Sequence, residues 1–183
     1  DVANQQNWRM CAPTFLGWDI LDPAKSHRGV FFKAILENAC YQAFGEYANV
    51  GRITGRTDLP RQLVLSGGAA HSPVWCQILS DVLGKPVITP VEKEGTAIGA
   101  AIYAAVGAGL YHSTDEAVKA LVRQERVYEP DLGNHAVYLE EYARWRALYE
   151  NGLDLLERGL VKSMWQPPLT RSETQKANPW KLR

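Results

Sequence analysis

Two adjacent glycines, Gly67 and Gly68, stand between a short apolar run at residues 63–65 and a helical pattern. Ser72 is a favourable N-cap for that helix, and Pro73 suits the first helical position, where a missing N–H has no cost. A strand, a glycine turn and a helix N-terminus in this order can bind an anion, because backbone N–H groups converge there and the helix dipole favours negative charge. Glycine also lets a phosphate or a sugar approach the main chain closely. The pattern therefore predicts a nucleotide site at this turn.

The same glycine pair has a purely structural explanation as a tight turn between a strand and a helix. Two other phosphate-binding signatures are excluded by the residues that follow it. The Rossmann fingerprint needs Gly-x-Gly-x-x-Gly, whereas Gly67-Gly68 continues as Ala-Ala-His-Ser. The P-loop needs a Gly-Lys-Ser or Gly-Lys-Thr tripeptide, and the sequence has none.

Hydrophobic periodicity and helix-end signals predict the elements that hold this turn. The predicted helices cover residues 28–47, 72–83, 96–108, 114–122 and 135–156, and the predicted strands cover residues 62–66 and 87–89. Gly84 is a suitable C-terminal residue for the second helix, and Ser113 and Glu116 form a capping box for the fourth. The succession of strand, helix, strand and helix predicts a parallel sheet with right-handed crossovers.

Length and composition are those of an ordinary globular domain. The 183 residues suffice for one hydrophobic core, and 46% of them are hydrophobic. The 20 basic and 20 acidic residues give a net charge of zero, so nucleic acid is not an expected partner. No apolar stretch approaches about 18 residues, so no membrane span is expected. Cys11, Cys40 and Cys76 are widely spaced, which predicts reduced thiols in a cytoplasmic protein and no metal site.

Several motifs occur in an order that resembles the C-terminal domain of the FGGY carbohydrate kinases, a family of the actin/Hsp70/hexokinase-like ATPase superfamily. The central motifs are Gly67-Gly68-Ala69, Ser72, Gln77, Ser80–Gly84, the strand at residues 86–89 and Glu94–Ala101. The flanking motifs are Gly17, Lys33–Glu37 and Tyr41-Gln42 upstream, and Tyr128-Glu-Pro-Asp and the final tyrosine-rich helix downstream. The order of so many motifs makes the resemblance more specific than any one of them.

The resemblance implies an α/β fold of the ribonuclease H-like (actin/Hsp70/hexokinase-like ATPase) class. Residues 1–160 are then expected to form the C-terminal nucleotide-binding lobe of a two-lobed sugar kinase, and residues 161–183 a polar C-terminal tail. In this family the N-terminal lobe supplies the catalytic Asp and most sugar contacts. That lobe is expected outside this chain, so we name no catalytic residue and expect the chain to be inactive alone.

The resemblance also assigns the nucleotide-binding residues. Gly67 and Gly68 are expected to lie against the ribose and α-phosphate side of ATP, and Ala69 stands where a larger side chain would fill that space. Ser72 matches the position whose polar side chain faces the adenine, although N-capping alone also explains it. ATP and Mg²⁺ are the expected cofactors, and this chain is expected to supply no metal ligand.

Three other features have both structural and functional explanations. Glu37 and Asp81 are interpreted as structural carboxylates rather than as catalysts. The small-residue helix around Gly99 fits a hinge between lobes as well as ordinary alanine-rich packing. The final helix carries aromatic residues at 4-3-4 spacing from Tyr138 to Tyr149, which predicts a packing surface rather than a ligand platform.

Within the family, the sequence resembles the autoinducer-2 kinases most, in residues 4–18, in the form of the glycine turn and in the tail after Arg158. This implies phosphorylation of 4,5-dihydroxy-2,3-pentanedione on its terminal hydroxyl. Xylulose or ribulose kinases are the alternative, as is a non-catalytic nucleotide-binding module. The expected partners are a small sugar-like substrate and the chain's own N-terminal lobe, with neither nucleic acid nor membrane among them. A homodimer is compatible with the sequence.

Overall fold

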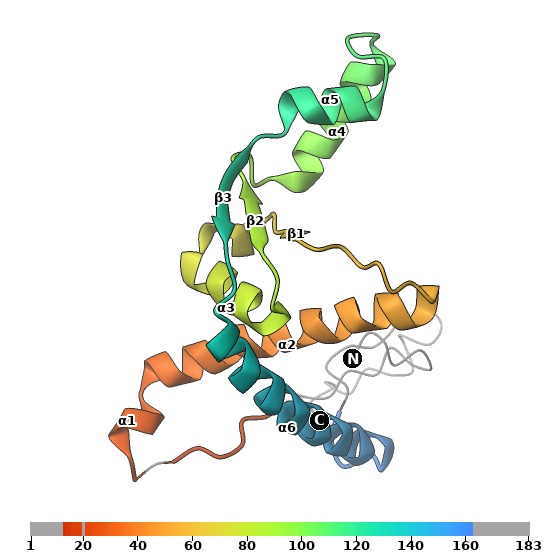
Figure 1. Cartoon of the computed structure of the whole chain (residues 1–183). Coiled ribbons are helices and arrows are strands. Elements are labelled where there is room, and N and C mark those ends of the chain that lie inside the picture. Colours follow the sequence, from red (N-terminus) through yellow and green to blue (C-terminus); the bar gives the residue numbers. More distant parts are fainter. Residues whose placement is uncertain (1–12, 20, 163–183) are drawn as a thin grey trace, which may run out of the picture.

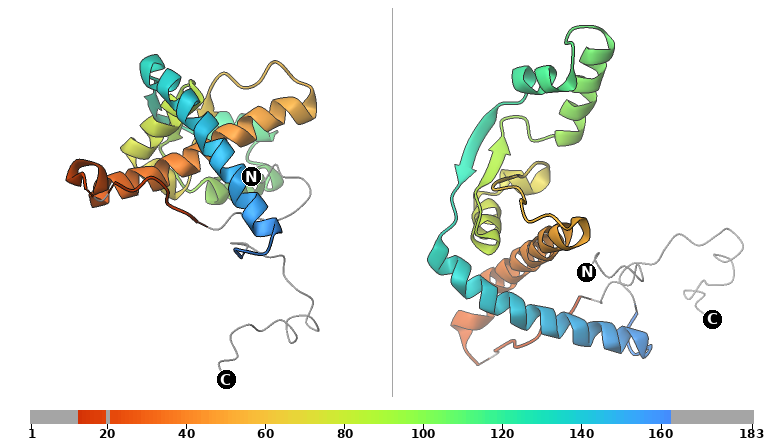
Figure 2. Two further views of the ribbon diagram at one scale, coloured as in Figure 1. Left: turned by 90° about the horizontal axis from the view of Figure 1, so that it is seen from below. Right: turned by 45° about the vertical axis from the view of Figure 1, so that its right-hand side comes forward.

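The computed structural model describes residues 13–19 and 21–162 (Figure 1). In chain order, the elements are α1 (Pro23–Ser26), α2 (Arg28–Thr54), β1 (Leu63–Val64), the 3₁₀ helix η1 (Gly68–His71), α3 (Pro73–Leu83), β2 (Val87–Pro90), α4 (Gly95–Gly107), α5 (Thr114–Leu121), β3 (Gln124–Tyr128) and α6 (Leu132–Glu157). The long helices α2 and α6 cross each other, and α3 lies between them and the sheet (Figures 1 and 2). The predicted tail, residues 161–183, lies outside the described residues from residue 163 onward.

The three strands form one sheet in the order β1-β2-β3. β1 and β2 are parallel, with Leu63 opposite Val87, which confirms the predicted strand–helix–strand unit. β3 is antiparallel to β2, with Val127 opposite Ile88, and the sequence signals did not predict it. The chain returns to the sheet through the paired helices α4 and α5, so the expectation of a parallel sheet holds for β1 and β2 only.

The hydrophobic core is centred on α3. This helix packs against α2, against α6 and against β2 and β3. Every residue of α3 from Ile78 to Leu83 is buried. The buried core residues are Leu36, Cys40, Tyr41, Cys76, Ile78, Leu79, Val82, Leu83, Val87 and Tyr128. Because close-packed neighbours surround α3 on several sides, its N-terminus is held in a defined place at the edge of the sheet.

The aromatic stripe of α6 packs against α2, as predicted. The ring of Tyr41 lies 6.2 Å from that of Tyr138, 6.1 Å from that of Tyr142 and 5.8 Å from that of Trp145, measured between centroids. The Nε1–H of Trp145 donates a hydrogen bond to Oδ1 of Asn38 at 2.9 Å. These contacts join the two long helices, and Tyr138, Tyr142 and Trp145 of the stripe are partly buried and pack against the core.

Helix ends marked by a capping residue agree with the sequence predictions. Ser72 Oγ accepts a hydrogen bond from the N–H of Trp75 at 3.3 Å, and Ser113 Oγ accepts one from the N–H of Glu116 at 3.2 Å. Gly84 ends α3 in the left-handed conformation, with φ of 61°. This conformation favours glycine because it has no Cβ.

The two long helices extend beyond their predicted ends. α2 continues past residue 47 to Thr54, where Gly55 adopts a φ of 66° and ends it. α6 begins at Leu132, because Oδ1 of Asp131 accepts hydrogen bonds from the N–H groups of Gly133 and Asn134. Both helices are only weakly amphipathic, so hydrophobic periodicity places their ends poorly.

The paired helices α4 and α5 project from the rest of the described structure (Figure 2). Their buried residues are Ile102 and Ala117, whereas Tyr103 and Leu110 are each 73% exposed. A Cβ added at Gly99 would meet nothing within 4 Å. The described residues therefore do not make the close helix–helix approach that would explain this glycine.

None of the helices within residues 13–19 and 21–162 has both the length and the apolar character needed to span a membrane.

The buried thiol of Cys40 makes stability depend on pH. Burial raises its pKa from the ordinary 9.0 to about 12, and the nearby Glu37 carboxylate adds to the shift. At a pH between these two pKa values, unfolding therefore releases the thiol proton. The contribution of the protonated Cys40 thiol to stability is complete below pH 9 and is lost as the pH rises toward 12. The free energy of unfolding of the wild-type chain, measured by urea unfolding, is expected to fall more steeply above pH 9 than that of Cys40→Ala, by at most about 1.4 kcal/mol per pH unit. Equal slopes in the two chains would contradict this.

Candidate functional site

Two glycine turns meet at one edge of the sheet. Because β1 and β2 are parallel, the segments that follow them leave the sheet at the same edge. The N–H of Gly67, which follows β1, donates a hydrogen bond to the carbonyl oxygen of Lys93, which follows β2, at 2.6 Å. The same carbonyl accepts a hydrogen bond from the N–H of Gly95 at 2.9 Å. In open α/β sheets this edge is the usual place for a ligand.

The surface in front of the first turn is open. Gly67 has φ of 77° and ψ of −165°, a backbone conformation that only glycine adopts without strain. Gly68 does not share this requirement, because its φ is not positive. A Cβ added at either glycine would meet nothing within 4 Å. Packing within the described residues therefore does not explain Gly68, whereas close approach of a ligand to the main chain would.

Ala69 and Ser72 complete the segment predicted to bind nucleotide. Both side chains are half-buried. The carbonyl oxygen of Ala69 accepts a hydrogen bond from the N–H of Ser72 at 3.1 Å, which closes η1 onto the start of α3. The hydroxyl of Ser72 accepts a hydrogen bond from the N–H of Trp75 and keeps its own proton for donation. N-capping and ligand contact are therefore compatible roles for this one hydroxyl.

At the second turn, the main chain of Gly95 lies close to the side chain of Ser66. A Cβ added at Gly95 would lie 2.6 Å from Oγ of Ser66 and 3.2 Å from its Cβ. Glycine at position 95 therefore lets the N-terminus of α4 lie directly against the residue that precedes the first turn. The two turns therefore lie next to each other, and the sequence-predicted residues Gly67 and Gly68 belong to the first of them.

An ion pair made by Lys93, the residue that joins the two turns, was not predicted from the sequence. Nζ of Lys93 lies 2.7 Å from Oε2 of Glu125 on β3, and the Lys93 side chain is only 14% exposed. The hydrogen bond from Lys93 holds the pKa of the Glu125 carboxyl below its usual range. The only sequence signal for β3 is the Val127-Tyr128 pair at its end, which is a weak indication of a strand.

A shallow hollow of about 140 Å³ lies beside the turns. Its lining residues, mostly apolar, are Val64, Ser66, Pro90, Glu92, Gly95, Ile98, Val122 and Arg123. The structure therefore places none of the four predicted nucleotide-binding residues in the wall of this hollow, although Ser66 and Gly95, which lie against each other beside the turns, both line it.

Asp81 is a structural carboxylate, as interpreted from the sequence. Its side chain is buried near the C-terminus of α3, where the helix dipole disfavours a negative charge. The charge is matched by α6: Oδ1 accepts from the N–H of Asp131 at 2.9 Å, and Oδ2 accepts from Nδ2 of Asn134 at 3.0 Å. Nε2 of Gln77 donates a further bond to Oδ1 at 2.8 Å. These bonds fasten the end of α3 to the start of α6.

Glu37 also has structural partners. Its Oε1 accepts a hydrogen bond from the hydroxyl of Tyr138 at 2.9 Å and lies 2.9 Å from Nζ of Lys33. The side chain is 19% exposed and lies between α2 and α6. It therefore joins the two helices. Within residues 13–19 and 21–162, no group of three or more His, Cys, Asp or Glu side chains could hold a metal ion.

The sequence is similar to those of known kinases. An autoinducer-2 kinase from Yersinia enterocolitica is 39% identical over 168 residues, and one from Escherichia coli K12 is 40% identical over 169 residues. Each alignment covers 92% of this chain and 31% of the relative. The chain thus spans about a third of the length of these curated relatives.

The fold is similar to those of solved sugar kinases. A xylulose kinase from Rhodospirillum rubrum aligns with a TM-score of 0.63 and 30% identity over 79% of this chain and 28% of that chain. A glycerol kinase from Plasmodium falciparum aligns with a TM-score of 0.63 and 21% identity over 78% of this chain and 27% of that chain, and this likeness concerns the fold alone. The fold is the ribonuclease H-like ATPase fold of these enzymes, as predicted.

The family assignment rests on a match over more than half of the chain. The profile described as "FGGY family of carbohydrate kinases, C-terminal domain" matches residues 5–108, which contain both glycine turns and the whole of α3. The chain therefore belongs to the FGGY family of carbohydrate kinases, and these residues belong to its C-terminal domain.

Proposed function

We propose that this chain is the nucleotide-binding part of an ATP-dependent kinase for a small sugar-like substrate. The observation that carries the proposal is the open Gly67-Gly68 turn, held at the carboxyl edge of two parallel strands by the carbonyl of Lys93. Gly67, Gly68, Ala69 and Ser72 would contact ATP, with the ribose and α-phosphate over the glycines and the adenine near Ser72. Family membership and the kinase relatives support this use of the turn.

Phosphoryl transfer requires more than this chain is proposed to supply. The γ-phosphate must be aligned with an acceptor hydroxyl, Mg²⁺ must spread the developing charge, and a carboxylate must accept the hydroxyl proton. We infer that the carboxylate and most substrate contacts lie in an N-terminal lobe, because the relatives are about three times longer than this chain. The described carboxylates Glu37 and Asp81 have structural partners instead.

The proposed acceptor is autoinducer-2, as 4,5-dihydroxy-2,3-pentanedione phosphorylated on its terminal hydroxyl. Support comes from relatives named autoinducer-2 kinase, which are 39% and 40% identical over 92% of this chain. A pentulose is the second candidate, because a solved xylulose kinase is 30% identical over 79% of the chain. The free, buried thiols of Cys40 and Cys76 support a reducing, cytoplasmic location.

A coupled ADP-release assay on the full-length protein tests this function. Dihydroxypentanedione, xylulose, ribulose and glycerol would be offered separately with Mg-ATP. Turnover on dihydroxypentanedione that is lost on chelation of Mg²⁺ is the expected result, together with no turnover by the 183-residue chain alone. Turnover confined to a pentulose would move the assignment to the second candidate. ATP binding without turnover on any of the four would favour a non-catalytic module.

A further inference from the structure

One residue, Lys93, contacts both glycine turns through its main chain. Its carbonyl oxygen accepts hydrogen bonds from Gly67 at 2.6 Å and from Gly95 at 2.9 Å. The Gly67 bond crosses from the segment after β2 to the segment after β1, so the position of the first turn depends on where the Lys93 carbonyl lies. A shift of this peptide would move both turns together.

The side chain of Lys93 fixes that peptide to β3. The Lys93 side chain is 14% exposed, and its Nζ lies 2.7 Å from Oε2 of Glu125, whose side chain is 48% exposed. The hydroxyl of Thr89, a fully buried residue of β2, donates a longer hydrogen bond to the same oxygen at 3.4 Å. The packing of the mostly buried Lys93 side chain and its ion pair with Glu125 together restrict the lysine to this position. Lys93 thus links the first turn, the N-terminus of α4 and β3.

We propose that Lys93, held by its ion pair with Glu125, is a positioning residue that sets the Gly67-Gly68 turn for nucleotide binding. The inference rests on the proposed function, because the turn must contact ATP for its position to matter. Lys93 acts on the nucleotide through the main chain of the turn and makes no direct contact with it. The acceptor substrate, which we place in the other lobe, should not sense this ion pair directly.

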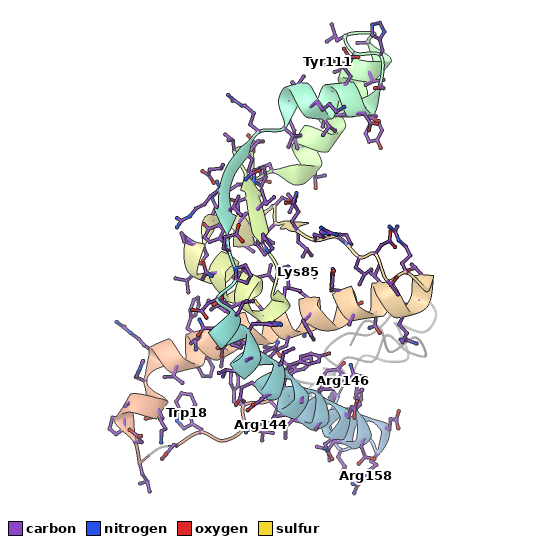
Figure 3. The ribbon with its side chains drawn as sticks, viewed as in Figure 1. Trp18, Lys85, Tyr111, Arg144, Arg146 and Arg158 are labelled. Atoms are coloured by element: carbon purple, nitrogen blue, oxygen red, sulfur yellow. The ribbon has the colours of Figure 1, made fainter. Side chains whose placement is uncertain are left out.

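The test is a set of variants of the full-length protein. Lys93→Met removes the ammonium group and keeps most of the apolar stem, and Glu125→Gln removes the opposite charge in case the first variant fails to fold. Lys93→Arg keeps a cation for Glu125. Lys85→Met is the matched control: Lys85 precedes the amino end of β2, at the opposite edge of the sheet (Figure 3), and its ammonium lies over the ring of Tyr47.

The expected result is a selective loss of nucleotide affinity. Lys93→Met and Glu125→Gln should raise the KM and Kd for ATP about tenfold, while kcat at saturating ATP and the KM for the acceptor change less than about twofold. Lys93→Arg should restore most of the ATP affinity, and Lys85→Met should leave it at the wild-type value. A thermal unfolding transition in each variant, compared with that of the wild-type protein, checks that the ATP affinity is measured on folded protein.

Three outcomes would overturn the inference. An unchanged Kd for ATP in both Lys93→Met and Glu125→Gln would show that the ion pair does not position the turn. Equal losses for ATP and acceptor without rescue by Lys93→Arg would show a merely structural role. Both results leave the proposed function intact, provided that the wild-type protein binds ATP. A wild-type protein that binds no ATP would overturn the proposed function and this inference together.

Discussion

Asp81→Ala is expected to lower the free energy of unfolding of the 183-residue chain by about 3 kcal/mol. The carboxylate is 4% exposed and accepts hydrogen bonds from Gln77, Asp131 and Asn134. Its removal leaves these donors without this acceptor in a place that water reaches poorly, and it opens a cavity between α3 and α6. Urea unfolding followed by circular dichroism measures the change.

Asp154→Ala is the matched control for this experiment. Asp154 lies on the surface of α6, where its side chain is 61% exposed and its Oδ2 lies 3.3 Å from Nη1 of Arg158. Exposed ion pairs contribute little, so its removal should change the free energy of unfolding by less than about 0.5 kcal/mol. If Asp81→Ala unfolds at the same urea concentration as this control, the network between α3 and α6 does not stabilise the chain.

Gly68→Leu is expected to weaken ATP binding by the full-length protein about a hundredfold while leaving its folding unchanged. The backbone at Gly68 has a conformation open to any residue, and nothing in the described structure lies within 4 Å of an added Cβ. A leucine side chain would instead occupy the space proposed for the ribose and α-phosphate. Gly67 would give a less clear test, because its φ of 77° would add backbone strain.

The measurements are the Kd for ATP and the thermal midpoint, with Gly107→Leu as the control. Gly107 also lacks a positive φ and has nothing within 4 Å of an added Cβ, but it lies at the far end of α4. This control should bind ATP as the wild-type protein does. Wild-type ATP affinity in a folded Gly68→Leu variant would place the nucleotide away from the first turn and would contradict the site assignment.

The two predictions concern opposite ends of the same helix. Asp81 fastens the C-terminal part of α3 to α6, whereas the glycine turn and Ser72 stand at its N-terminus. Because α3 is buried along most of its length, its position is set by the core and not by the turn itself. Stability and nucleotide binding should therefore respond separately to the two substitutions.

Local sequence signals predicted the helices whose ends carry a capping side chain or a terminating glycine. Ser72, Gly84 and Ser113 mark helix ends that the structure confirms, because a capping side chain or a left-handed glycine acts within a few residues of itself. The order of motifs around Gly67 was enough to predict the family and the fold. The aromatic spacing of α6 predicted a packing face for the same local reason, since residues three and four apart share one side of a helix.

The sequence by itself therefore determined the helices α2 to α6 except the ends of α2 and α6, the parallel strand pair, the family and the location of the glycine turn. Only the tertiary structure decided which distant groups meet there. β3 was not predicted, because its position depends on α4 and α5 returning the chain to the sheet. The Lys93–Glu125 ion pair, whose residues are 32 apart in sequence, was missed for the same reason, since Glu125 lies on β3. The partners of Asp81 at the start of α6, the N-cap Asp131 and Asn134, were likewise unpredictable, because they lie 50 and 53 residues away and are joined by packing rather than by a local period. Contacts of this kind depend on how helices and strands pack in three dimensions, and the spacing of residues along the sequence does not predict that packing.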